Sequence, residues 1–215
     1  KDKPRATKER QTMTRLFNAL HAIHFFTTVM TQKLIRQTLA HTKSIKKLKA
    51  VRFKKNHYII ENKLYTSFHQ KPIELSLFLK ELLDLPMSVK KFDRSYIYYA
   101  SKIQHPNKQT HVHKTLIRKL LFKPNLYAII KLLYNSSLFQ TIIPTAKKMI
   151  NLPQFDGYHQ QPVDIHSIHT LKNIDHIDDR FVKNIYEELT PNQKGMVRIA
   201  ALFHDIGKGR KTDHH

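Results

Sequence analysis

A histidine and an aspartate stand side by side near the C-terminus of the chain, where an apolar stretch ends. Residues Met196–Phe203 are mostly small or apolar, as in a buried helix, and His204, Asp205 and a glycine-containing segment follow them. His166 lies 38 residues upstream, in a second segment of helical spacing. Two imidazoles and one carboxylate from two helices form a mixed nitrogen and oxygen site, of the kind that binds Mn²⁺, Fe²⁺, Zn²⁺ or Mg²⁺. The pattern therefore predicts a divalent-metal site.

Each of these residues also has an ordinary structural interpretation. A His-Asp pair is expected by chance in a chain with 15 histidines, and Lys208, one turn past the pair, would complement the helix dipole. His166, His169 and His176 share one helical face, and such a face is more often hydrated than ligating. The combination favours a site, because the buried helix, the His-Asp-Ile-Gly-Lys-Gly segment and an upstream histidine occur together, with His214 a few residues beyond.

The composition indicates a globular, mainly helical protein. Its 215 residues are 40% hydrophobic and 10% aromatic, which excludes a wholly disordered chain. Only 4 glycines and no tryptophan argue against a dinucleotide-binding Rossmann domain, whose phosphate loop alone uses three glycines. The absence of cysteine excludes disulfides, cysteine-ligated zinc and cysteine nucleophiles, and fits a reducing compartment. With no run of 18 apolar residues and no leader-like N-terminus, we expect a cytoplasmic protein that does not associate with membranes.

The charge is distributed unevenly along the chain. The net charge is +22, but residues 1–55 hold 15 basic and 2 acidic side chains, residues 56–150 hold 15 and 5, and residues 151–215 hold 8 and 9. The basic part is either a solvated helical scaffold or a surface that attracts an acidic partner or a neighbouring catalytic domain. A non-catalytic, basic helical module that binds nucleic acid is the alternative of another class. It is disfavoured, because no aromatic pattern typical of RNA binding is interleaved with the basic run at 43–55.

Hydrophobic spacing predicts helices along most of the chain, with one short β-hairpin near 51–66, where the period changes from 3.6 to about 2. A linker with two prolines and a glycine follows residue 150, so we expect domains at 1–155 and 156–215. The predicted helices are two within 11–50, one in 72–86, one each at about 88–103, 109–122, 124–136 and 138–150, and three at about 163–177, 180–189 and 191–204.

The segment from Tyr158 onward resembles the HD-domain metal-dependent phosphohydrolases. The similar stretches are Val163–Ser167 (Val-Asp-Ile-His-Ser), Ala200–Arg210 (Ala-Ala-Leu-Phe-His-Asp-Ile-Gly-Lys-Gly-Arg) and Asp213-His214. Within these hydrolases, the chain is most similar to the family of bifunctional PII uridylyltransferase/uridylyl-removing enzymes. Weaker similarities upstream occur in the same order as in the helical linker of that family: Asn18–His21, the basic segment 32–50, the predicted hairpin, and Ile143-Pro144.

The resemblance implies a fold, a chemistry and partners. It implies an all-α architecture in which residues 1–155 are a helical linker region and 156–215 are the first helices of an HD-type phosphohydrolase domain. The activity implied is metal-dependent hydrolysis of the phosphodiester that joins UMP to a tyrosine of the PII signalling protein, with Mg²⁺ or Mn²⁺ as the metal. His166, His204, Asp205 and His214 are the implied metal ligands, and Asp205 and Lys208 the implied catalytic residues. UMP or UTP and glutamine would act through the parent enzyme in nitrogen signalling.

The chain also departs from the family pattern. His215 stands where the family usually has serine, and the chain stops before the distal aspartate that completes the HD-domain ligand set. It has neither the nucleotidyltransferase domain nor the glutamine-sensing domains. We therefore expect an internal, truncated fragment of a longer enzyme, with at most trace phosphodiesterase activity by itself. Another HD-family phosphohydrolase acting on nucleotides is the alternative within the same chemistry.

Overall fold

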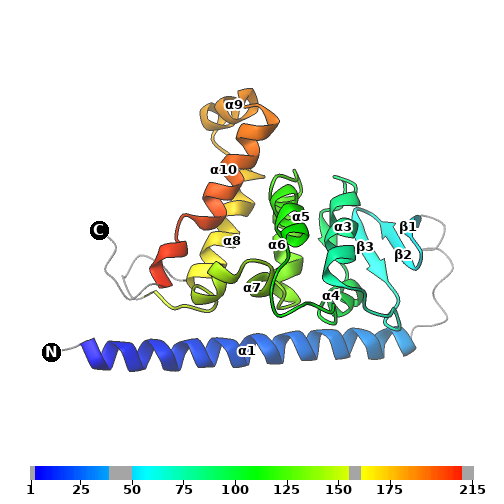
Figure 1. Ribbon diagram of the computed structural model, residues 1–215, viewed down its shortest axis with the longest axis horizontal. Helices are drawn as coiled ribbons and strands as arrows, with labels where there is room; N and C mark the ends of the chain where they lie inside the picture. The colour runs from blue at the N-terminus through cyan, green and yellow to red at the C-terminus, as the bar shows by residue number, and fades with distance from the viewer. Residues whose placement is uncertain (1–2, 39–49, 155–160, 210–215) are drawn as a thin grey trace. The chain divides into compact units, whose positions relative to one another are not determined.

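The computed structural model describes residues 3–38, 50–154 and 161–209 as helices, strands and connecting turns (Figure 1). They form two compact units. The first combines Lys1–His24 with Ile143–His215, and the second is Phe25–Ile142. The predicted domain boundary near residue 155 differs from this division. It stays a prediction, because packing into compact units does not test which segments fold independently. Within the described residues, no helix combines the length and the apolarity that crossing a membrane needs.

The N-terminal segment is one long helix, α1 (Lys3–Thr38), whose residues divide between the two units. The prediction of two helices within 11–50 is wrong in this respect. Neither proline nor glycine occurs between Pro4 and Pro72, so nothing in the sequence stops the helix between the two apolar patterns. The rest of the second predicted helix, residues 39–49, lies outside the described part of the chain.

The second unit contains a small sheet with strand order β1-β2-β3-β4. The first three strands form an antiparallel meander, and the fourth pairs parallel with β3. Their bounds are β1 Val51–Lys54, β2 His57–Ile60, β3 Lys63–Thr66 and β4 Lys91–Phe92. The predicted hairpin is therefore present but incomplete. Asn56, with a φ of 67°, lies in the turn between β1 and β2, and Glu61 and Asn62 (φ 49° and 60°) form the turn between β2 and β3, so the predicted hairpin region holds three strands.

Among the described residues after β3, five α-helices of the second unit supply mainly leucine, isoleucine and aromatic side chains to its core. The helices are α3 Leu75–Asp84, α4 Arg94–Ala100, α5 His111–Leu121, α6 Leu126–Asn135 and α7 Phe139–Ile142. The predicted helix at 88–103 begins later, because residues 91–92 pair with β3 and the Asp93 side chain caps α4 by accepting from the Ser95 backbone N–H. The mainly helical fold class is confirmed.

The first unit contains the remaining elements. They are the 3₁₀ helix η2 Pro144–Lys148, α8 Val163–Ile174, α9 Arg180–Glu188, α10 Pro191–Phe203 and the 3₁₀ helix η3 Ile206–Gly209. The predicted helix at 138–150 is split into α7 and η2, because Pro144 has no backbone N–H to continue the α-helical ladder. The three helices predicted after residue 162 are present, each ending within three residues of its predicted end.

A polar cluster is buried in the second unit, between the sheet and two helices. His57 Nε2 on β2 lies 3.5 Å from Glu81 Oε1 on α3, and the Tyr96 hydroxyl on α4 donates a hydrogen bond to the same carboxylate oxygen. The rings of Tyr96 and Tyr99 lie 5.4 and 5.2 Å from the His57 ring. Buried polar groups of this kind are costly unless they pair, so the cluster ties β2, α3 and α4 to one arrangement.

We predict that acid weakens the second unit through His57. Burial, with a smaller contribution from Lys54, lowers the pKa of His57 from 6.5 to about 4. Between these values the unfolded chain binds more protons than the folded chain, so stability that is present above pH 6.5 is lost as the pH falls toward 4. The loss from this group would reach about 3 kcal/mol.

The measurement is urea unfolding followed by circular dichroism from pH 7 to pH 4.5, for the wild type and His57→Phe. Burial raises the pKa of Glu81, so this group makes the folded state more stable as the pH falls. Comparing the wild type with His57→Phe separates the contribution of His57 from that of Glu81. The wild type should lose more of its free energy of unfolding on acidification than the variant. Parallel profiles for the two proteins would contradict the prediction.

Candidate metal centre

The start of α8 is fixed by a buried carboxylate two residues before His166. Asp164 is fully buried, and its Oδ2 accepts a hydrogen bond of 2.8 Å from the backbone N–H of Asn151. Asn151 has a φ of 52°, and its side-chain amide donates to Asn18 Oδ1 on α1 at 2.6 Å. Burial lowers the pKa of nearby His21, and the Asp164 charge partly opposes this shift. This network joins three segments of the first unit and holds the helix that carries His166.

The helix α10 positions the His204-Asp205 pair close to His166. Thr190 and Gln193 form a capping box at its start, and Pro191 occupies the first turn, where its missing N–H costs nothing. The helix packs against α8, and Leu171 of α8 and Leu202 of α10 are fully buried. Because His204 directly follows the last helical turn, this packing sets its position relative to His166.

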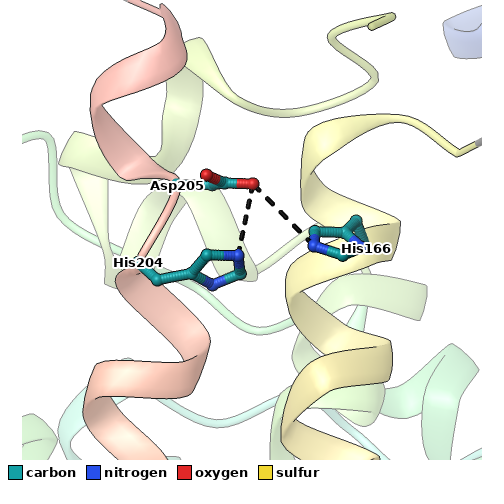
Figure 2. A group of neighbouring side chains, drawn as sticks. All are labelled: His166, His204 and Asp205. Atoms are coloured by element: carbon teal, nitrogen blue, oxygen red, sulfur yellow. Dashed lines mark ion pairs between the residues drawn. The ribbon is translucent and has the colours of Figure 1, made fainter. Parts of the chain in front are cut away.

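His166, His204 and Asp205 converge in the folded chain (Figure 2). One possible ligand atom from each lies within 4.8 Å of the others. Asp205 Oδ2 lies 3.2 Å from His204 Nε2 and 3.9 Å from His166 Nε2, and the two imidazole rings are 5.2 Å apart in an edge-to-face arrangement. The His204 Nδ1 lies 2.9 Å from the carbonyl oxygen of Ala201, which leaves Nε2 facing the carboxylate. The structure therefore brings these three predicted residues together, and their role as metal ligands stays a prediction.

Lys208 lies at the same carboxylate. A 3₁₀ turn, η3, follows Asp205 and brings Lys208 Nζ to 3.0 Å from Asp205 Oδ2. On its other side, Lys208 Nζ donates a hydrogen bond of 2.7 Å to Gln154 Oε1. Three nitrogen-bearing side chains therefore face one carboxylate oxygen.

The environment of Asp205 Oδ2 indicates whether these residues could bind a cation. This atom is buried and has no partner with hydrogen-bond geometry among residues 3–38, 50–154 and 161–209. An oxygen that is shielded from solvent, without a formal hydrogen bond and flanked by two imidazole nitrogens suits a ligand to a divalent ion. The histidine side chains are about one-third exposed, so an ion and a substrate could reach them. The donor set therefore fits a metal.

The remaining predicted site residues divide into two groups. His214 lies outside the described residues, so its predicted role as a ligand stays a prediction. His169 lies on α8 with His166, but the predicted shared face does not extend to His176, because α8 ends at Ile174. Both His169 and His176 are exposed and lie outside the cluster of three. Sequence reasoning missed Gln154, because a glutamine beside Pro153 in a linker carries no signal of a contact 54 residues away.

Comparisons with known proteins now bear on this geometry. No family model and no solved structure matches the chain. Curated relatives do match it, and the three described here are each named bifunctional uridylyltransferase/uridylyl-removing enzyme. The relative from Acinetobacter baumannii (strain ACICU) is 28% identical over 171 residues, which is 73% of this chain and 19% of the relative. The chain is homologous to part of these enzymes.

Two further relatives have higher identity over shorter stretches. The enzyme from Photobacterium profundum is 33% identical over 102 residues, which cover 45% of this chain and 12% of the relative. The enzyme from Vibrio parahaemolyticus is 34% identical over 99 residues, which cover 42% of this chain and 11% of the relative. The matches thus span about a fifth or less of the relatives' length, and they support the family resemblance found in the motifs.

We predict that the capping box contributes to the stability of the unit that carries the site. Replacing Thr190 by alanine removes the side-chain oxygen that accepts from the Gln193 backbone N–H, and should lower the free energy of unfolding by about 1 kcal/mol. Thr190→Ser keeps that oxygen and should retain most of the stability. Urea unfolding followed by circular dichroism measures both variants, and an equal loss in the serine variant would contradict the role of the cap.

Proposed function

We propose that this chain contributes the uridylyl-removing site of a bifunctional enzyme of nitrogen signalling. The reaction is hydrolysis of the phosphodiester between UMP and a tyrosine of the PII signalling protein. The observation that carries the proposal is the convergence of His166, His204 and Asp205 in a chain homologous to enzymes named for uridylyl removal.

The proposed metal ligands are His166, His204 and Asp205, with His214 as a further one. Mg²⁺ or Mn²⁺ fits the proposed phosphate chemistry, and Fe²⁺ or Zn²⁺ also fits the donor types. When bound, such an ion lowers the pKa of its water and neutralises charge that builds up on phosphate oxygens. The mixed imidazole and carboxylate donors of this chain supply the negative charge and fixed positions that hold it.

Asp205 and Lys208 are the proposed catalytic residues. In the reaction, the water oxygen forms a bond to phosphorus, the bond from phosphorus to the tyrosine oxygen breaks, and a proton reaches the departing tyrosine oxygen. Asp205 orients the attacking water through its carboxylate, and the Lys208 ammonium pairs with a phosphate oxygen as a point charge. His214 is the proposed donor of the proton to the tyrosine oxygen, if it does not ligate a metal.

The proposal also assigns partners and a compartment. PII is the macromolecular substrate, UMP is a product, and UTP and glutamine act elsewhere in the parent enzyme. The second unit, with 22 lysines and arginines against five acidic residues, supplies a positive surface for an acidic protein partner or a neighbouring domain. PII signalling takes place in the cytoplasm, so the proposal locates the protein there.

The activity test uses the complete gene product and uridylylated PII with Mn²⁺ or Mg²⁺. We predict that His204→Ala and Asp205→Ala each abolish UMP release, because each removes a proposed ligand, and that both leave the uridylylation of PII intact. Release of UMP is measured chromatographically, and uridylylation by incorporation of labelled UMP. Full release by His204→Ala would overturn the mechanism, and loss of both activities together would indicate a structural role. Hydrolysis of free nucleotides but not of modified PII would favour another HD-type phosphohydrolase.

Metal binding can be tested on this chain directly. We predict saturable but weak binding of Mn²⁺ by calorimetry, and an affinity more than about tenfold lower in Asp205→Ala, since that change removes the only carboxylate of the cluster. His176→Ala alters an exposed histidine outside the cluster and should bind as the wild type does. Equal affinity of Asp205→Ala and wild type would contradict the assignment of the ligands. Hydrolysis of modified PII by this chain alone should be at trace level.

A further inference from the structure

Lys208 is held between two oxygen atoms of different kinds. On one side its Nζ lies 3.0 Å from the buried Asp205 Oδ2, and on the other it donates at 2.7 Å to Gln154 Oε1. A lysine ammonium has three N–H donors and a flexible four-carbon stem. Lys208 donates one N–H to Gln154 and its ammonium lies at ion-pair distance from Asp205, so the stem is fixed at both sides and N–H donors remain for a substrate.

The orientation of the Gln154 amide is itself fixed. Its Nε2 donates a hydrogen bond of 3.1 Å to the backbone carbonyl of Gln161, and a carbonyl can only accept. The amide oxygen must therefore face away from Gln161, toward Lys208. Both contacts agree on one orientation of the amide, so the acceptor for Lys208 is built into the site.

We propose that Gln154 is a positioning residue that holds the Lys208 ammonium beside Asp205 with one N–H directed to a substrate phosphate oxygen. Without this second acceptor, the flexible lysine has only the carboxylate as a partner, and its remaining donors have no fixed direction. The hydrogen bonds of the Gln154 side chain within the described residues are to Lys208 and Gln161, so its proposed action is through Lys208. The proposal rests on the proposed phosphodiester hydrolysis and adds the residue that orients its cation.

Two variants distinguish the role of the Gln154 amide oxygen, which accepts from Lys208, from that of its N–H, which donates to Gln161. Gln154→Glu keeps an acceptor oxygen for Lys208 and loses the donor to Gln161, whereas Gln154→Met has a similar length and loses both. Gln140, an exposed glutamine of α7 in the other unit, provides a matched control as Gln140→Met.

Kinetics of UMP release from modified PII by the complete gene product is the first measurement. Gln154→Met should lower kcat by about tenfold, as is common for residues that support a ligand or catalytic group, and should leave Mn²⁺ affinity within twofold. Gln154→Glu and Gln140→Met should retain most of the activity. An equal loss in Gln154→Glu and Gln154→Met would overturn the proposal, because the contact to Gln161 would then be the important one.

A double-mutant cycle tests whether Gln154 acts through Lys208. In a Lys208→Met background, Gln154→Met should cause no further loss of kcat, since the group that it positions is already absent. Independent, additive losses would indicate a general structural role and would contradict positioning.

An NMR measurement that needs no catalytic activity tests the positioning of Lys208 separately from the proposed function. The ¹³Cε resonance of Lys208, assigned by its loss in Lys208→Arg, should move toward that of exposed lysines in Gln154→Met but not in Gln154→Glu. If the wild type releases no UMP while this pattern holds, the proposed function fails and the positioning of Lys208 by Gln154 stands. An unchanged resonance in Gln154→Met would overturn the positioning.

Discussion

A single buried carboxylate oxygen determines the arrangement of the candidate metal centre. Asp205 Oδ2 is shielded from water, and the side-chain nitrogens of His166, His204 and Lys208 lie 3.0 to 3.9 Å away. A buried negative charge is tolerated only where opposite charges or polar groups surround it, so the elements that carry these nitrogens must meet at this point. A divalent cation bound there would satisfy the same oxygen.

Packing and hydrogen bonds away from the site hold these elements in place. The helices α8 and α10 pack against each other and each carries a fully buried leucine, and the capping box fixes the start of α10. The Asp164 carboxylate connects the start of α8 to Asn151, and through it to Asn18 of α1. The histidines thus sit on helices whose positions depend on apolar burial and on satisfied buried polar groups, which favours a preorganised site.

The acidic residues of the second unit are few, and several of them are buried or paired with a lysine. Two of its five acidic residues, Glu81 and Asp93, are buried in hydrogen-bonded positions. Asp84 pairs with Lys54 at 2.8 Å, so few acidic groups remain to oppose the many lysines and arginines. The positive net charge of this unit follows from its composition of 22 lysines and arginines and five acidic residues.

The helical class, the apolar faces and the candidate residues of the centre can be inferred from the amino-acid sequence. The spacing of leucines predicted most helices, because local periodicity is encoded locally. The convergence of His166 with the His-Asp pair was permitted by their placement on two helices and implied by the resemblance to HD-domain phosphohydrolases. The unbroken α1 agrees with the lack of proline and glycine between Pro4 and Pro72, whereas the extra strands and the place of Gln154 follow from the tertiary structure. These depend on contacts between distant segments, such as β4 pairing with β3 and Gln154 reaching Lys208, and no local pattern specifies which partner a backbone group or a side chain will find.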